Sequence, residues 1–362
     1  MSNSLNEARK KINSIDKEMA RLFEERMRAA EVVAEYKKEN GLPILDPERE
    51  EAVIRNGAES ISNDTYKEYY TGFQRSTMAI SRAYQARLIE GMKIAFSGAE
   101  GAYAHIAACR LFPTAKKIGY ASFEEAYNAT VNGECDVALL PMENSYNGEV
   151  GQVTDLMFSG PLHVNTVTEL EISHDLLAPK GAKLEDIRTV ISHPQALAQC
   201  REFILSRGYE QIEHANTADA AKYVAKTNDL TVAAIASAEA ADIFGLQVID
   251  SNITSSRSNT TRFAVFSRSS NSHRTEDMSL CSILLFTVKH EAGALAKAIN
   301  VIGKYEYNLG ALRSRPMKNL LWQYYFYLEI EGNLNTDKGE RMKNELAEHC
   351  DKLKIVGTYK KF

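Results

Sequence analysis

The sequence predicts a multidomain fold that starts all-helical, continues as an α/β domain and ends in a small β-α-β-β-α-β unit. Three observations predict it. Residues 5–90 carry helical periodicity with almost no strand signal. Residues 92–268 alternate short β-branched runs with helical segments, which favours a largely parallel sheet. Residues 280–362 show the element order of a ferredoxin-like domain, after a polar linker at 269–279. We therefore place the domains at 1–90, 92–268 and 280–362.

The composition excludes several classes of protein. The 362 residues include 43 lysines and arginines and 48 aspartates and glutamates, so the net charge is −5 and no global positive field attracts a nucleic acid. No run approaches the ~18 apolar residues that span a bilayer, and the first residues lack the core of a signal peptide. Five scattered cysteines without zinc spacing indicate a reduced chain that binds no metal. We expect a cytoplasmic protein with neither a nucleic-acid nor a membrane partner.

The first helix carries cations on its apolar stripe. Apolar residues recur at spacings of three and four from Ile12 to Val33, which indicates a core face. Arg9, Arg26 and Lys37 continue that register. Any one of them is explained by an ion pair or a snorkelling stem, but three cations on one face favour an anionic ligand. At a rise of about 1.5 Å per residue, Arg26 and Lys37 lie about 17 Å apart and can grip one small molecule.

Arg9 cannot reach the same molecule from the same chain. It lies about 26 Å from Arg26 along the helix axis, so an Arg9 in that pocket comes from a second chain. A helix of this length also needs a partner to cover its apolar face. We expect an intertwined dimer.

The next two helices add polar residues that have simple structural explanations. Asp46 is a candidate N-cap before Pro47 at the first helical position, which presents Arg49 and Glu50 in the first turn. In the third helix, a serine and a glutamine share a face at i and i+4. Capping alone explains the aspartate, and a hydrogen-bonded surface edge explains the pair.

Taken together, these residues resemble the all-helical chorismate mutase family, with its Arg, Arg, Lys, Asp-x-x-Arg-Glu and Ser-x-x-x-Gln pattern. The resemblance implies a binding site for chorismate made of Arg9, Arg26, Lys37, Asp46, Arg49, Glu50, Ser81 and Gln85. It implies that the cations bind the carboxylates and the ether oxygen, that Glu50 holds the hydroxyl, and that Lys37 and Gln85 are catalytic. A Claisen rearrangement needs no nucleophile or base, and residues 1–90 contain neither histidine nor cysteine.

Four polar clusters in the α/β domain fall at predicted strand ends, where such domains place ligands. They are Gly98–His105, Pro141–Ser145, Ser192–Gln195 and Asn259–Phe263. In the third, Ser192 or His193 caps a helix that we expect to run from Pro194 to Ser206. Each cluster alone is explained by cap or turn chemistry.

Their order resembles prephenate dehydratase, with its Gly-x-x-Gly-x-Tyr, Pro-x-Glu-Asn, Ser-His-Pro-Gln and Thr-Arg-Phe signatures. The resemblance implies two lobes like those of a periplasmic binding protein, with the site in the cleft. The implied site residues are Tyr103, Glu143, Asn144, Ser145, Ser192, His193, Gln195, Thr260, Thr261, Arg262 and Phe263. Ala102 departs from the serine or threonine common there.

Dehydration of prephenate couples loss of carbon dioxide to departure of a hydroxyl. We interpret Thr261 as the catalytic donor to the leaving oxygen, either passing a proton or only stabilising charge. Arg262 then binds a substrate carboxylate, and Asn144 helps to orient the ring with Ser192 and Gln195. A carboxylate such as Glu143 near a dianion must be protonated or turned towards a cation.

The last domain resembles the ACT regulatory domain. The resemblance implies phenylalanine binding at Gly293, Ala294, Leu295, Ser314, Arg315 and Pro316. Arg313 replaces the glutamate of the family's Glu-Ser-Arg-Pro, which leaves the strength of any feedback open.

The combined expectation is a bifunctional enzyme of phenylalanine biosynthesis. Its substrates are chorismate and prephenate, phenylalanine is its effector, it needs no cofactor or metal, and it forms a homodimer or homotetramer. Two alternatives remain: a dehydratase that prefers arogenate, and a sensor of aromatic metabolites that has lost catalysis.

Overall fold

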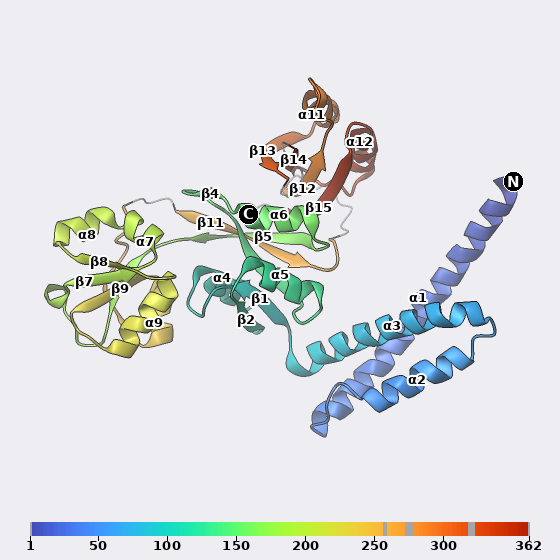
Figure 1. Ribbon diagram of the computed structural model, residues 1–362, viewed down its shortest axis with the longest axis horizontal. Helices are drawn as coiled ribbons and strands as arrows, with labels where there is room; N and C mark the ends of the chain where they lie inside the picture. Colours follow the sequence, from blue (N-terminus) through green and yellow to red (C-terminus); the bar gives the residue numbers. More distant parts are fainter. Residues whose placement is uncertain (1, 256–258, 272–278, 318–322, 361–362) are drawn as a thin grey trace. The chain divides into compact units, whose positions relative to one another are not determined.

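The computed structural model describes residues 2–255, 259–271, 279–317 and 323–360 (Figure 1). The chain forms two compact units, Met1–Met92 and Lys93–Phe362. Among the residues described, no helix is long and apolar enough to cross a membrane.

The first unit consists of three helices, as the periodicity predicts. They are α1 (Ser2–Glu39), α2 (Pro47–Glu59) and α3 (Asp64–Glu90). Asp46 caps α2 by accepting the amide of Arg49 at 3.0 Å, and Asn63 caps α3 by accepting the amide of Thr65 at 3.0 Å. These side chains satisfy amides that the first turn of a helix leaves without a partner.

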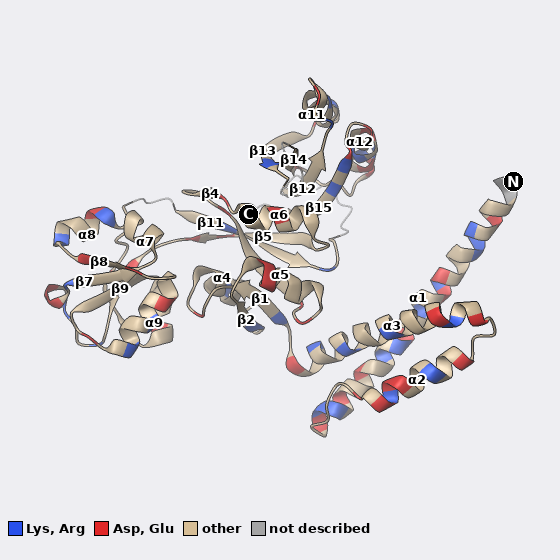
Figure 2. Ribbon diagram, viewed as in Figure 1, with Lys and Arg blue, Asp and Glu red and all other residues tan. Residues whose placement is uncertain are grey.

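The N-terminal half of α1 projects beyond α2 and α3 (Figure 1). Its apolar stripe is therefore exposed in the single chain: Ile12 is 55% and Leu22 is 50% accessible. Figure 2 shows lysine and arginine interspersed with aspartate and glutamate along all three helices. The periodicity predicts that this stripe is buried in a core, but within the helical unit it is exposed.

The first lobe of the second unit is built on a six-stranded sheet, in the order β2-β1-β3-β11-β5 with β4 beside β3. Its strands are β1 (Lys93–Ser97), β2 (Lys116–Tyr120), β3 (Val137–Asn144), β4 (Gly148–Glu149), β5 (His163–Glu171) and β11 (Thr260–Ser267). Its helices are α4 (Tyr103–Leu111), α5 (Phe123–Val131) and α6 (Gly151–Ser159).

The second lobe is built on a five-stranded sheet in the order β10-β6-β9-β7-β8. Its strands are β6 (Asp175–Ala178), β7 (Thr189–Ser192), β8 (Glu210–Glu213), β9 (Val232–Ala236) and β10 (Gln247–Asp250). Its helices are α7 (Pro194–Gln199), α8 (Arg201–Arg207), α9 (Thr217–Thr227) and α10 (Ala238–Phe244), with a 3₁₀ turn at Leu184–Asp186.

Two predictions for these lobes are wrong. The sheets are mixed rather than largely parallel, because β11 is antiparallel to both β3 and β5, and β6 is antiparallel to β9 and β10. The chain leaves the first lobe along β5 and returns along β11, so these strands must run in opposite directions. The single helix expected from Pro194 to Ser206 is divided at Cys200, whose φ of −104° and ψ of 15° interrupt the helix.

The C-terminal domain has the predicted β-α-β-β-α-β order. Its elements are β12 (Leu280–Thr287), α11 (Ala294–Lys304), β13 (Asn308–Pro316), β14 (Tyr324–Glu331), α12 (Asp337–Ala347) and β15 (Lys352–Lys360). The strands pair antiparallel in the order β13-β14-β12-β15, a ferredoxin-like arrangement. Residues 272–278 of the predicted linker lie outside the described residues.

Both faces of this last sheet are buried. Leu284 and Phe286 of β12 pack into a core with α11 and α12. Ile283 and Leu285, which alternate with them, share a core with Val164 of β5 and with the first lobe. A strand that is buried on both faces usually has a continuous run of apolar residues in its sequence, and β12 has such a run. The C-terminal domain and the first lobe therefore stabilise each other through one common core.

Gly357 of β15 lies against the backbone of β5 within this common core. A Cβ added to it would overlap the carbonyl oxygen of Val164 in β5. The pairing of β15 with β12 also shifts register beside it, between Ile283 and Leu284. A glycine is required here because no side-chain atom fits.

We predict that Gly357→Ala lowers the free energy of unfolding by about 1–3 kcal/mol, since overpacking forces the strands apart. Thermal or urea unfolding of the whole chain measures it. Gly303→Ala is the matched control, because nothing lies within 4 Å of its added Cβ and alanine favours a helix by about 0.5–1 kcal/mol. Equal stability of the two variants would show that the approach of β15 to β5 is not tight.

Candidate active sites

The helical unit contains a cavity of about 380 Å³ lined by all three helices and the loop after α1. It brings together seven of the eight residues predicted for this unit. They are Arg26, Lys37, Asp46, Arg49, Glu50, Ser81 and Gln85. A cavity of this size suits a small metabolite.

Cations outnumber acids around this cavity. Arg26 donates to the Ser81 hydroxyl at 2.9 Å, and Lys37 donates to the carbonyl oxygen of Ile44 at 2.5 Å. Glu50 is paired with Arg82, a cation that the sequence reasoning missed although it lies three residues before Gln85 on α3. Four lining cations face two lining acids, so the cavity favours an anionic ligand.

Gln85 is buried, and its Oε1 makes no hydrogen bond with the described residues. The two ends of a glutamine amide are assigned from the hydrogen bonds they make. A half-turn of this amide would place an NH₂ donor where no protein acceptor competes for it. Gln85 can therefore bind an acceptor oxygen of a ligand.

Arg9 is the predicted residue that does not line this cavity. It lies on the exposed N-terminal half of α1, about 26 Å along the axis from Arg26 at about 1.5 Å per residue. The placement agrees with the expectation that Arg9 cannot serve the pocket of its own chain.

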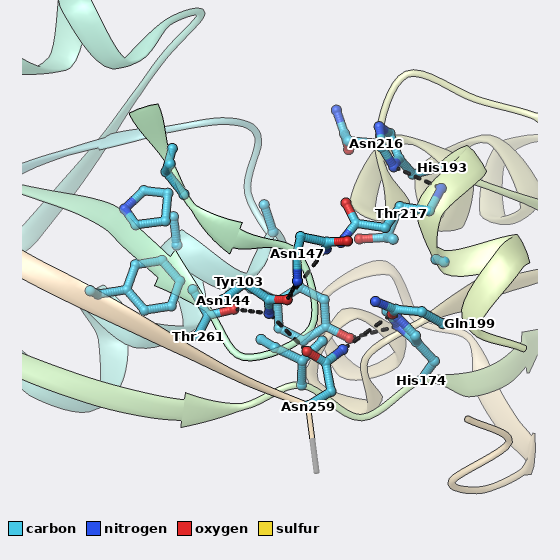
Figure 3. A pocket seen from close by; sticks show the side chains of 18 of the residues that line it. Tyr103, Asn144, Asn147, His174, His193, Gln199, Asn216, Thr217, Asn259 and Thr261 are labelled. Carbon is cyan, nitrogen blue, oxygen red and sulfur yellow. Dashed lines mark hydrogen bonds between the residues drawn. The ribbon is translucent and has the colours of Figure 1, made fainter. Parts of the chain in front are cut away.

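The second unit contains a cavity of about 420 Å³ between its two lobes (Figure 3). Six of the eleven residues predicted for this domain line it. They are Tyr103, Asn144, His193, Gln195, Thr261 and Phe263. Both sheets therefore contribute to one cleft.

Thr261 and Asn144 form the polar centre of the cleft wall. They are paired across β11 and β3, and the amide of Asn144 donates to Thr261 Oγ1 at 2.9 Å. Thr261 is only 8% accessible. Because its oxygen accepts this hydrogen bond, its own proton remains available to an acceptor in the cleft.

A chain of hydrogen bonds continues from Asn144 into the second lobe through residues that the sequence reasoning missed as site residues (Figure 3). Asn144 donates to Asn259 Oδ1 at 2.8 Å, and Asn259 donates to Gln199 Oε1 at 3.2 Å. His174 Nε2 contacts the same Gln199 oxygen at 2.8 Å, and its Nδ1 lies 2.9 Å from the Tyr103 hydroxyl. Gln199 could have been predicted as a site residue, because it lies four residues after Gln195 on the same face of α7.

This series of hydrogen bonds ends at His174 and Tyr103, two buried side chains that stay neutral. Burial lowers the pKa of His174 and raises the pKa of Tyr103 well above its usual value. The Tyr103 hydroxyl also donates to the carbonyl oxygen of Ser173 at 2.6 Å. Gln199 Nε2 is buried and has no partner among the described residues, so it is a donor that a ligand in the cleft can use.

No lysine or arginine is among the described residues that line the cleft. The N-termini of α4 and α6 open onto it instead, through Ala102 and Val150. Neither helix has a side-chain cap or an acidic residue in its first turn. Their free amides and positive dipole ends are therefore suited to bind anionic groups. At α4 the N-cap residue is Ala102, which has no capping side chain to occupy the first amides of that helix.

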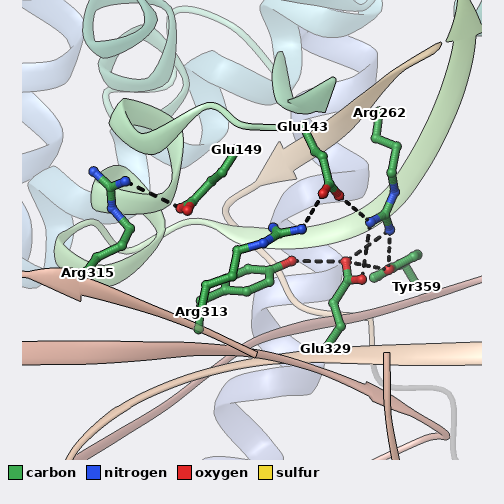
Figure 4. Close-up of polar contacts among 8 residues, drawn as sticks. Glu143, Glu149, Arg262, Arg313, Arg315, Glu329 and Tyr359 are labelled. Atoms are coloured by element: carbon green, nitrogen blue, oxygen red, sulfur yellow. Dashed lines mark hydrogen bonds and ion pairs between the residues drawn. The ribbon is translucent and has the colours of Figure 1, made fainter. Parts of the chain in front are cut away.

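The structure corrects the placement predicted for Arg262 and Glu143. Both alternate with cleft residues along their strands and lie on the opposite face of the sheet. Arg262 donates to Glu143 at 3.0 Å and to Glu329 of β14 at 2.9 Å (Figure 4). Glu143 is therefore turned towards cations, and Arg262 does not face a ligand in the cleft.

Three further predicted residues make structural hydrogen bonds, and two of them, Ser192 and Ser145, do not line the cleft. The Ser192 hydroxyl is fully buried and donates to the carbonyl oxygen of Ile235 at 2.5 Å. The Ser145 hydroxyl accepts the amide of Thr260 at 2.9 Å, which ties the ends of β3 and β11 together. His193 caps α7 by accepting the amide of Gln195 at 3.2 Å, yet it lines the cleft as well.

The predicted effector residues fall on two elements of the C-terminal domain. Gly293 is the N-cap of α11 with a φ of +80°, and Ala294 and Leu295 open that helix. Ser314, Arg315 and Pro316 end β13. Arg315 pairs with Asp155 of α6 at 3.1 Å. Among the described residues no group of histidine, cysteine or acidic side chains is arranged to hold a metal ion.

Two family models match the chain. Residues 8–86 match chorismate mutase type II, and residues 94–271 match prephenate dehydratase. The bifunctional chorismate mutase/prephenate dehydratase of Enterobacter agglomerans is 30% identical over 99% of this chain and 96% of its own length.

Two solved structures each resemble 75% of this chain. One, described as GqqA, a novel type of quorum quenching acylase, is 29% identical with a TM-score of 0.69 and covers 75% of this chain and 98% of its own. The prephenate dehydratase of Arthrobacter aurescens, solved in complex with L-Phe, is 23% identical with a TM-score of 0.69. It covers 75% of this chain and 90% of its own and shows the fold.

We predict that His174 makes the free energy of unfolding fall as the pH drops below about 6.5, its unfolded pKa. Burial lowers the folded pKa of His174, so the unfolded chain takes up a proton first. The resulting slope is at most about 1.4 kcal/mol per pH unit. Urea unfolding of wild type and His174→Gln between pH 7.5 and 5 measures it.

Tyr103→Phe is the matched control for this prediction. It removes the hydroxyl beside His174 Nδ1 but leaves the histidine buried, so it should keep the wild-type slope. A His174→Gln variant with the same slope as wild type would contradict the prediction.

Proposed function

The chain belongs to the family of bifunctional chorismate mutase/prephenate dehydratases, and from that premise we propose which residues perform each step. The enzyme rearranges chorismate to prephenate and converts prephenate to phenylpyruvate, two steps of phenylalanine biosynthesis. Two separate cavities, one in each unit, support one site for each reaction.

The cavity of the helical unit is the proposed mutase site. Arg26, Lys37 and Arg49 bind the two carboxylates of chorismate and hold the compact conformer in which the reacting carbons meet. Lys37 and Gln85 donate to the ether oxygen, on which negative charge develops as its bond breaks. The free end of the Gln85 amide supports this role. Glu50, now paired with Arg82, accepts the substrate hydroxyl.

A second copy of the chain completes the proposed mutase site. The exposed stripe from Ile12 to Leu22 needs a cover, and Arg9 lies in the same N-terminal half of α1. An antiparallel partner would cover the stripe and carry its own Arg9 to this pocket. The assembly is therefore a homodimer, or a homotetramer if the C-terminal domains also pair.

The cleft is the proposed dehydratase site. The observation that supports it best is the pair Asn144 and Thr261, in which the threonine proton is left for the cleft. Thr261 donates to the hydroxyl of prephenate, which leaves as hydroxide or water. The carboxylate on the opposite ring carbon departs as carbon dioxide, and its electron pair makes the ring aromatic. The amides of α4 and α6 bind the carboxylates in the role first assigned to Arg262. Gln199 Nε2 orients the substrate.

The C-terminal domain is proposed to be an ACT domain that binds phenylalanine and regulates the cleft. The Arthrobacter aurescens dehydratase was solved with L-Phe bound, and the element order here is the same as that expected of an ACT domain. The proposed effector residues are Gly293 to Leu295 and Ser314 to Pro316. Binding there would shift the equilibrium between two states of the cleft, with a coupling of ~1–3 kcal/mol.

We predict that the two activities separate by mutation. Lys37→Ala should lower the kcat/KM of chorismate disappearance by about 10²–10³-fold, the effect of losing one preorganised donor, and leave phenylpyruvate formation unchanged. Thr261→Ala should do the reverse. Both activities of each purified variant are measured beside its circular dichroism spectrum. Loss of both activities in a folded variant would contradict two independent sites.

We predict that phenylalanine suppresses phenylpyruvate formation from added prephenate. Chorismate disappearance in the same preparation is the internal control. Arogenate supplied in place of prephenate tests substrate preference, and the kcat/KM for prephenate should be the larger one. A prephenate rate unchanged by saturating phenylalanine would refute the proposed effector, while absence of both rates in folded enzyme would favour the sensor.

A further inference from the structure

Four charged residues form an ionic cluster between the first lobe and the C-terminal domain (Figure 4). The first lobe contributes Glu143 of β3 and Arg262 of β11, and the C-terminal domain contributes Arg313 of β13 and Glu329 of β14. Arg262 bridges both carboxylates, at 3.0 Å to Glu143 and 2.9 Å to Glu329. Arg313 pairs with Glu143 from the other side.

The cluster is charge-balanced and largely buried. Glu329 is 8% accessible and also accepts the hydroxyls of Tyr327 and Tyr359 at 2.9 Å each. Burial would raise the pKa of Glu329, but the hydrogen bonds from Arg262 keep that pKa below its usual value. Two cations offset two anions. Removing the charge of Arg313 therefore takes a partner from Glu143, and removing the charge of Glu329 takes a partner from Arg262.

The cluster lies directly behind the polar centre of the cleft. In the pairing of β3 with β11, Glu143 is opposite Arg262 and Asn144 is opposite Thr261. Successive strand residues point to opposite faces, so one pair faces the C-terminal domain and the next faces the cleft. The register also shifts between Arg262 and Phe263. At such an irregularity, regular ladder bonds hold the backbone less firmly.

A second arginine of β13 holds the neighbouring part of the cleft wall. Arg315 pairs with Asp155 of α6 at 3.1 Å and with Glu149 of β4 at 3.6 Å. Glu149 lines the cleft and is opposite Glu143 in the β3–β4 hairpin. Arg313 and Arg315, two alternate residues of β13, thus form ion pairs with both strands of this hairpin.

We propose that Arg313 and Glu329 are positioning residues for dehydration of prephenate. Through Glu143 and Arg262 they fix the backbone that carries Asn144 and Thr261, although neither touches the cleft. The C-terminal domain is then part of the dehydratase machinery even without an effector. This inference rests on the proposed cleft chemistry of Thr261.

The test uses the full chain and steady-state kinetics with prephenate. Arg313→Gln removes the charge that faces Glu143, Glu329→Gln removes the charge that faces Arg262, and Arg313→Lys keeps a cation. Lys304→Ala is the matched control, because Lys304 pairs with Glu345 at 2.7 Å within the C-terminal domain. Thermal unfolding of every variant shows whether it is folded.

Loss of positioning should lower kcat about tenfold with KM within about twofold, since misplaced donors weaken interactions made in the transition state. We expect this for Arg313→Gln and Glu329→Gln, and Arg313→Lys should recover most of kcat. Lys304→Ala should retain the wild-type kcat. Chorismate disappearance should not change in any variant.

Two results overturn the inference. One is a wild-type kcat in folded Arg313→Gln and Glu329→Gln, and the other is an equal loss in Lys304→Ala, which would reflect general disturbance of the domain. Both results can be distinguished from a failure of the catalytic role proposed for Thr261. In that case Thr261→Ala would retain the wild-type rate whatever the cluster variants do.

Discussion

The pairing of β3 with β11 is the constraint on which the second unit depends. One register places Asn144 against Thr261 on the cleft side and Glu143 against Arg262 behind them. Because side chains alternate along a strand, the chemistry of the cleft and the contact with the C-terminal domain cannot be changed independently. A slip of one residue would send the charged pair into the cleft and bury the threonine against β14.

The helical unit is organised by charge instead. Four cations and only two acids line its cavity, and the described residues of this unit leave the apolar stripe of α1 exposed. Both features are unfavourable for an isolated, empty protomer. In the proposed function a dianionic substrate relieves the repulsion among the cations, and a second copy of α1 covers the stripe. Ligand binding and assembly are thereby linked to the stability of the same three helices.

The helical fold of the first unit and the common face of Arg26 and Lys37 could be predicted from the sequence, because the helical period decides which residues share a face. Arg82, which also lines the cavity, was not predicted. The cleft was harder to predict. Strand alternation separates Thr261 from Arg262, but no local pattern shows that the C-terminal domain covers the second face. His174, Gln199 and Asn259 meet only because the chain crosses twice between the lobes. The antiparallel position of β11 has the same long-range origin.

The proposed binding of substrate carboxylates by helix N-termini, in place of arginines, has a consequence for turnover. Prephenate enters with two carboxylates, but phenylpyruvate keeps one, and carbon dioxide leaves uncharged. In the proposed arrangement the departing carboxylate deprives the amides of α4 or α6 of their anion. The site thus holds its product by fewer contacts than its substrate, and the reaction itself opens the way to product release.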